Sequence, residues 1–154
     1  MTTKKSHLMT LCSLIMLSCA LLLPARSWAG CHDSLVGSGG IQLDVESCFN
    51  SDLSGYVDST VIHDGVDHGY VIVGAEAIVY DVTASQQVFS QSAFDVSSWP
   101  GDEIELNFDS SQFSPAPISG HTYQLTAKAC AANSYSDSGT CSGWTIADQL
   151  RVTY

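Results

Sequence analysis

The first 29 residues constrain the fold more than any other part of the chain, because they indicate the compartment in which the rest folds. An almost wholly apolar run over residues 8–23 follows two lysines near the start. Ser27 and Ala29 then place small side chains at the two positions that a signal peptidase reads. We therefore expect a secretory signal peptide over residues 1–29, an oxidising destination, and a single domain over residues 30–154.

The cleavage point determines how the exported chain is released. Trp28-Ala29-Gly30-Cys31 loosely resembles a lipobox, in which the cysteine becomes the acylated first residue. Arg26 interrupts the apolar approach, and a tryptophan stands where a leucine-like residue is usual. A secreted or periplasmic domain that begins at Gly30 is the first prediction, and a domain anchored by lipid through Cys31 is the alternative.

The chain beyond the signal is strongly acidic. It keeps two basic residues, Lys128 and Arg151, against all 16 acidic residues, which is a formal net charge of −14. Nucleic acids and anionic membranes are bound through lysine and arginine, so neither is expected as a partner. No later apolar stretch approaches the roughly 20 residues that span a bilayer, so no transmembrane span is expected. Cations, basic proteins and neutral glycans remain as possible partners. The alternative is that the negative charge serves only solubility.

Four cysteines remain after the signal, at positions 31, 48, 130 and 141. An even number in an exported chain predicts two disulfides, and three pairings are open. Proximity along the sequence favours Cys31 with Cys48 and Cys130 with Cys141. Each bond would close a short loop and contribute about 2–4 kcal/mol to stability. A metal site made of the four thiols is disfavoured, because the sequence has no Cys-x-x-Cys pair and export favours oxidation.

Alternation of apolar and polar residues predicts strands along the chain. Ile41, Leu43 and Val45 alternate with polar neighbours, which is typical of a half-buried strand. Residues 69–82 are rich in Val, Ile and Tyr around Gly74, which predicts one long strand with a bulge or two strands around a bend. Further strands are expected at residues 87–90, 103–108, 122–131 and 145–154, separated by turn-forming clusters at 36–40, 50–55, 97–102, 110–120 and 133–143. Many short strands with frequent turns predict an all-β antiparallel sandwich.

One segment carries a family resemblance. Residues 118–129 read Ile-Ser-Gly-His-Thr-Tyr-Gln-Leu-Thr-Ala-Lys-Ala, so a turn with glycine precedes a tyrosine and then alternating apolar residues. This segment resembles the penultimate strand of fibronectin type III and related immunoglobulin-like domains. The resemblance implies an immunoglobulin-like β-sandwich in which Tyr123 is the corner tyrosine, with its ring in the core and its hydroxyl bonded to the upstream backbone. It implies no catalytic residues, because such domains mostly bind, space or display.

The densest set of potential metal ligands is His63, Asp64, Asp67 and His68. A turn at Gly65 could bring two imidazoles and two carboxylates together around a divalent transition metal. Asp-Gly is also a common hairpin turn pair, so a hydrated turn is the alternative. No other cofactor is expected.

A second metal candidate depends on cleavage after Ala29. The new terminus Gly30-Cys31-His32 would offer an amine, two backbone amides and an imidazole, a square-planar set of nitrogens suited to Cu(II) or Ni(II). Acylation at Cys31 would remove this site. An incidental third-position histidine is the alternative.

Signs of catalysis and of glycan binding are sparse. The sequence has no Gly-x-Ser-x-Gly nucleophile elbow. Asp102, Glu103 and Glu105 are carboxylates that a glycosidase could pair, although such pairs are expected by chance among 16 acidic residues. Trp99 and Tyr135 fall in loop-like stretches and are candidates for stacking on sugars, with packing against the domain as the alternative.

We therefore expect an exported, non-catalytic binding or interaction module whose partner is a protein or a glycan. Loops at one end of the sandwich, at residues 63–68 and 133–143, would supply the contact surface. A small secreted hydrolase that uses paired carboxylates is one alternative. A metal-binding module that uses His63 and His68 is the other.

Overall fold

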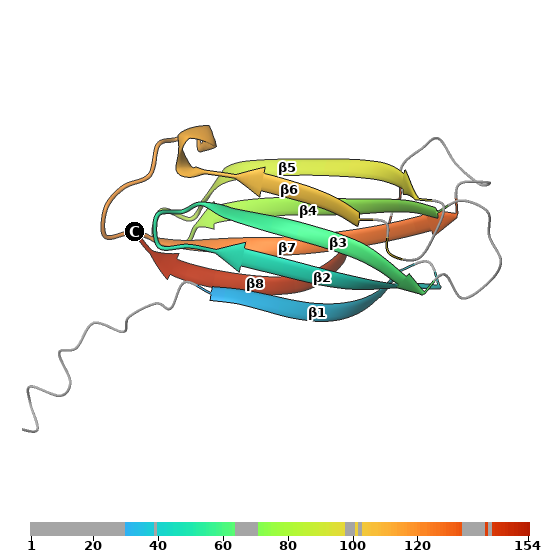
Figure 1. The fold of residues 1–154 in the computed structure, drawn as a ribbon. Helices are drawn as coiled ribbons and strands as arrows, with labels where there is room; N and C mark the ends of the chain where they lie inside the picture. The colour runs from blue at the N-terminus through green and yellow to red at the C-terminus, as the bar shows by residue number, and fades with distance from the viewer. Residues whose placement is uncertain are drawn as a thin grey trace, which may run out of the picture.

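The computed structural model of the chain describes residues 30–38, 40–63, 71–97, 101, 103–133, 141 and 143–154. The elements in them are β1 (Gly30–Ser38), β2 (Ile41–Phe49), β3 (Gly55–His63), β4 (Val71–Asp81), β5 (Gln86–Ser97), β6 (Glu103–Phe108), the 3-10 helix η1 (Ser110–Gln112), β7 (Thr122–Asn133) and β8 (Thr145–Thr153) (Figure 1). The predicted all-β class is confirmed. These segments hold no helix with the length and apolarity that a membrane crossing requires.

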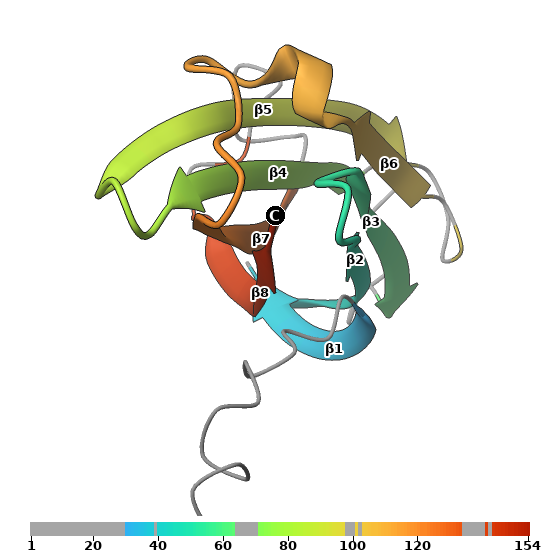
Figure 2. The same cartoon turned by 90° about the vertical axis from the view of Figure 1, so that its left-hand side faces the viewer.

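The strands form two antiparallel sheets of four. Sheet A has the order β1-β2-β3-β6, and sheet B has the order β5-β4-β7-β8. Figure 2 looks along the strands and shows the two sheets wrapped around a common interior. The edge strands meet on both sides, with β1 beside β8 and β5 beside β6. The predicted antiparallel β-sandwich is therefore confirmed.

The core is built from the alternate residues of each strand that point between the sheets. In β2 these are Ile41, Leu43, Val45 and Phe49, all buried, whereas Gln42 and its alternate neighbours face outward. Sheet B contributes fully buried alanines from β4 and β7 to this core. An aromatic cluster fills one end of the core, and its members are Phe49, Phe89, Phe108, Phe113 and Tyr123.

The structure shows whether the segment around Gly74 forms one strand or two. Residues 71–81 form one strand, and its register shift lies at Val79/Tyr80 rather than at Gly74. A Cβ atom at Gly74 would lie 2.7 Å from the Cys130 Sγ atom and 2.9 Å from a Phe94 ring carbon. The glycine is therefore required for the close packing of neighbouring side chains on the outer face of sheet B.

Both favoured disulfides are present. Cys31 and Cys48 are directly opposed on β1 and β2, with their Cα atoms 4.0 Å apart. Cys130 on β7 is bonded to Cys141, with a Cα–Cα distance of 6.0 Å. The first bond ties the N-terminal strand to the sandwich. The second closes the connection between the last two strands.

Candidate functional site

The outer face of sheet A carries a concentration of negative charge. Because side chains alternate along each strand, the residues between the buried core positions point away from sheet B. Six of these outward residues are acidic, and we call them the acidic face: Asp33 on β1, Asp44 and Glu46 on β2, Asp58 on β3, and Glu103 and Glu105 on β6. Among the described outward side chains of sheet A there is no lysine, arginine or histidine.

Four of these carboxylates form a straight row across the sheet. Asp33 is paired with Glu46, Glu46 with Asp58, and Asp58 with Glu105, so one acid from each strand stands directly opposite the next. We call these four residues the acidic row. Like charges directly opposite one another destabilise a sheet. The arrangement therefore lowers the stability of sheet A.

The members of the row differ in their hydrogen-bond donors. The Tyr56 hydroxyl donates to Glu46, and the Asn107 amide donates to Glu105. The Oδ1 atom of Asp58 is buried and has no hydrogen-bond partner in the described part of the chain. The carboxylate of Asp58 is thus less well satisfied than those of Glu46 and Glu105, its two neighbours in the row.

These contacts shift the pKa values of two residues, Asp58 and Tyr56. Burial raises the pKa of Asp58 to about 6, and the negative charges of Glu103, Glu105 and Glu46 add to the effect. The hydrogen bond to Glu46 is the main cause that raises the pKa of the Tyr56 hydroxyl to about 12, so this hydroxyl stays protonated and keeps donating.

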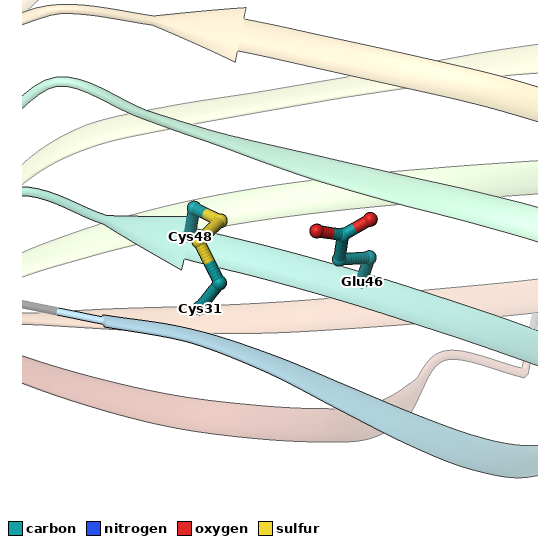
Figure 3. A group of neighbouring side chains, drawn as sticks. All are labelled: Cys31, Glu46 and Cys48. Carbon is teal, nitrogen blue, oxygen red and sulfur yellow. A yellow bond between two sulfur atoms is a disulfide. The ribbon is translucent and has the colours of Figure 1, made fainter.

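One cluster of metal-ligating residue types touches the same face. Ligand atoms of Cys31, Glu46 and Cys48 lie within 4.8 Å of one another (Figure 3). The two sulfur atoms are joined in a disulfide and offer no thiolate, so Glu46 is the one anionic ligand of the group. This cluster is a crosslink beside a carboxylate and not a metal centre.

The outer face of sheet B has a different charge. Lys128 on β7 and Arg151 on β8 both point outward there, and they are the two basic residues beyond the expected signal. Lys128 pairs with Glu76 at 2.8 Å, and Arg151 Nε donates to Gln124 at 2.6 Å. Lys128 and Arg151 thus lie on one sheet, and the acidic face lies on the other.

Tyr123 has the two features that its resemblance implied. Its ring is 1% exposed, and its hydroxyl accepts a hydrogen bond of 2.8 Å from the backbone amide of Ile118. The hydroxyl also donates to Asp81, which accepts from His121 Nδ1 at 2.8 Å and from the Ala84 amide at 2.9 Å. Burial opposes ionisation of Asp81, but these donors outweigh it and lower its pKa. The network joins the β4–β5 turn to the start of β7.

A second histidine–aspartate contact lies where β1 meets β8, with the His32 side chain exposed. His32 Nδ1 is 3.1 Å from Asp148 Oδ2 and 3.3 Å from the Ser34 hydroxyl, and the Ser47 hydroxyl donates to Asp148 at 3.3 Å. A serine–histidine–aspartate relay needs both ring nitrogens, whereas these contacts share Nδ1. They hold two strands together. The square-planar site at residues 30–32 stays a prediction, and it would require these residues to leave β1.

Several sequence-predicted site residues lie outside the described residues. These are Asp64, Asp67, His68, Trp99, Asp102 and Tyr135, and His63 is described only as the last residue of β3. The metal and glycan sites and the two loop contact surfaces therefore stay predictions. Of the three carboxylates considered for a hydrolase, Glu103 and Glu105 lie on the acidic face.

Sequence reasoning missed the part of the face that comes from β1, β2 and β3. Asp44 and Glu46 are two positions apart within a predicted strand, which already places them on one polar face. No signal in the sequence gives the register that aligns Asp33 and Asp58 with them.

No protein-family model and no curated protein matches the sequence of this chain.

Proposed function

We propose that the protein is an exported, non-catalytic interaction module that contacts a cationic protein partner through the acidic face of sheet A. The acidic row is the observation that carries this proposal. Its four carboxylates lower the stability of the sheet, and no described cation on that face offsets them. Local arrangements that oppose the stability of the fold are expected mainly at functional sites.

The distribution of charge over the two sheets supports the choice of partner. Lys128 and Arg151 lie on the far side of the sandwich, so they do not screen the acidic face. A face of one sign attracts partners of the opposite sign, and it raises the association rate and the selectivity more than the affinity itself.

An immunoglobulin-like or fibronectin type III-like fold would suit a binding role. Immunoglobulin domains place strands A, B and E in one sheet and strands C, F and G in the other. The order β2-β3-β6 corresponds to A, B and E, and β4-β7-β8 corresponds to C, F and G. The chain adds β1 at the edge and pairs β5 with β4. Tyr123 at the start of β7 corresponds to the corner tyrosine near the start of strand F.

Export is supported by the two disulfides, since such bonds form and persist in oxidising compartments. A periplasmic or extracellular location would place the acidic face in contact with other exported proteins or with cell-surface polycations.

Binding of poly-L-lysine to the disulfide-bonded protein tests the proposal. We expect saturable binding by calorimetry at low ionic strength that weakens steeply as salt is added, because exposed charges are screened within about 10 Å at 0.1 M. The double variant Glu46→Gln/Glu105→Gln removes two charges of the acidic row. It should weaken binding by about tenfold.

The matched control removes two charges elsewhere. Asp52→Asn/Asp109→Asn alters one carboxylate in the β2–β3 turn and one at the N-cap of η1, for the same change of net charge, and asparagine can still accept the backbone hydrogen bonds at both positions. It should bind poly-L-lysine almost as well as the unmodified protein. An equal loss of affinity in both double variants would mean that net charge, and not the acidic face, is responsible.

A carboxylate hydrolase is the second candidate, and Asp58 is the reason. A carboxyl group with a pKa of about 6 beside the exposed Glu105 is the combination that glycosidases use as acid and partner carboxylate. Release of nitrophenol from nitrophenyl glycosides, lost in Asp58→Asn, would favour this candidate. A rate equal to that of buffer across the substrate set would reject it.

A further inference from the structure

The centre of the acidic row holds a carboxylate that its surroundings favour in the neutral form. Asp58 stands between two acids, with Glu46 opposite on β2 and Glu105 opposite on β6. Its Oδ1 atom is buried and receives no hydrogen bond from any described residue. A buried carboxylate oxygen without a donor is costly when ionised, whereas a protonated carboxyl group carries its own donor.

Every charged group described around Asp58 has the same sign. The directly opposed groups are Glu46 and Glu105, and the diagonal acids are Asp44 on β2 and Glu103 on β6. The remaining titratable neighbour is Tyr56, two residues away on β3 itself, and its hydroxyl is directed at Glu46. No described cation on this face compensates the charge of Asp58.

Asp58 differs from its two neighbours in the row in the hydrogen bonds that it receives. Glu46 accepts a hydrogen bond from the Tyr56 hydroxyl, and Glu105 accepts one from the Asn107 side-chain amide. A hydrogen-bond donor of this kind stabilises an ionised carboxylate. Asp58 has no such donor at its buried oxygen. Protonation of Asp58 relieves the repulsion on both sides of it at once.

We propose that Asp58 is a proton-binding site that couples the stability and the charge of sheet A to pH, protonated under mildly acidic conditions and ionised at neutral pH. The elevated pKa of about 6 agrees with this geometry. This inference goes beyond the proposed function, because proton uptake by Asp58 does not require a binding partner.

The direction of the pH dependence follows from linkage. The pKa of Asp58 is raised in the folded chain, so between its ordinary value of 3.8 and about 6 the folded state binds more protons than the unfolded state. Stability therefore falls as the pH rises through this interval and levels off above about 6. Above that interval the ionised carboxylate destabilises the fold.

Urea unfolding of the disulfide-bonded protein between pH 5.0 and 7.5 tests the proposal, with Asp58→Asn as the variant. Asparagine keeps the size of the side chain and removes its charge. At pH 7.5 we expect the variant to have an unfolding equilibrium constant about fivefold lower than the unmodified protein. At pH 5.0 this advantage should shrink, because the unmodified Asp58 is by then protonated.

Asp44→Asn is the matched control. Asp44 lies on the same face, but its register partners are Leu35 and Thr60, which carry no charge. The free energy of unfolding of the Asp44→Asn variant should change with pH in the same way as that of the unmodified protein. Contributions from titratable groups elsewhere in the chain are common to all three proteins and cancel in the differences. Parallel pH profiles for Asp58→Asn and the unmodified protein would overturn the proposal.

Carboxyl carbon NMR of the unmodified protein provides a second measurement that does not depend on the folding of a variant. The Asp58 carboxyl resonance should titrate with a midpoint near 6. A midpoint near the ordinary value for aspartate would reject the proton site. If the midpoint is confirmed and poly-L-lysine binding is absent, the proposed function fails and this inference stands.

Discussion

Two aspartates show how the donors around a carboxylate decide its ionisation. Asp81 is 3% exposed, yet hydrogen bonds from His121, Ala84 and Tyr123 overcome burial and lower its pKa. Asp58 is less buried, but it lacks a donor at Oδ1 and is surrounded by acids, so its pKa rises to about 6. Burial alone would have ranked the two residues in the opposite order. The hydrogen-bond partners have to be known as well.

Ser59 is a second polar group without a partner, and it predicts a stabilising substitution. Its side chain points from sheet A into the core between the two sheets, where it is 0% exposed. None of the described residues forms a hydrogen bond with its hydroxyl. Because a buried hydroxyl without a partner is unfavourable, Ser59→Ala should raise the free energy of unfolding by about 1 kcal/mol. Urea unfolding at constant pH measures this change.

Ser47 provides the control for Ser59. It is equally buried, but its hydroxyl donates to Asp148 at 3.3 Å. Ser47→Ala should therefore lower the free energy of unfolding by about 1 kcal/mol. Equal effects of the two substitutions would contradict the idea that the missing hydrogen bond explains the behaviour of Ser59.

At the scale of the element, the sequence predicts strands best where a strict alternation shows which side is buried. The strand at residues 103–108 was predicted with its observed bounds, and residues 122–131 fall within β7. β1 was not predicted as a strand, because it lies at an edge and six of its nine residues are glycine, serine, histidine or aspartate. β3 was missed because Ser59 occupies one of its core positions and interrupts the apolar pattern.

The two disulfides could be predicted from the spacing of the cysteines once export was expected, whereas the contribution of each bond to stability depends on the surrounding packing. Cys31–Cys48 spans 17 residues and lies within a ladder that already pairs all of β1 with β2. Cys130–Cys141 spans 11 residues, and its Cys130 sulfur packs closely over Gly74. Because the two loops are of similar length, the two disulfides should restrict the unfolded chain to a similar extent. Their packing in the folded protein differs.

Removal of each disulfide by paired serine substitutions should separate these contributions. Cys31→Ser/Cys48→Ser should lower the free energy of unfolding by about 3 kcal/mol and leave the amides of β1 protected from exchange. Cys130→Ser/Cys141→Ser should cost about 1 kcal/mol more, because it also loses packing around Gly74. Urea unfolding and hydrogen exchange measure both outcomes. Loss of protection confined to β1 in the first variant would show that the ladder depends on the crosslink.

At the scale of the whole molecule, net charge indicates an acidic protein but not where its charge lies. The net charge predicts that nucleic acid is not a partner, but the sequence does not give the register that places four acids in one row or the topology that places Lys128 and Arg151 on sheet B. These features arise from pairings between strands that are distant along the chain. Charge separation between the two faces is therefore a property of the fold.

This separation predicts how salt affects the stability of the molecule. At pH 7.5 the acidic row repels itself, so an increase from about 20 mM to about 300 mM sodium chloride should raise the midpoint of urea unfolding as the Debye length shortens. The increase should be smaller at pH 5.0, where Asp58 is protonated, and smaller in Glu46→Gln/Glu105→Gln, which lacks two charges of the row. Asp52→Asn/Asp109→Asn should respond like the unmodified protein at pH 7.5. If the response to salt followed net charge in all four measurements, the acidic row would not be the dominant source of repulsion.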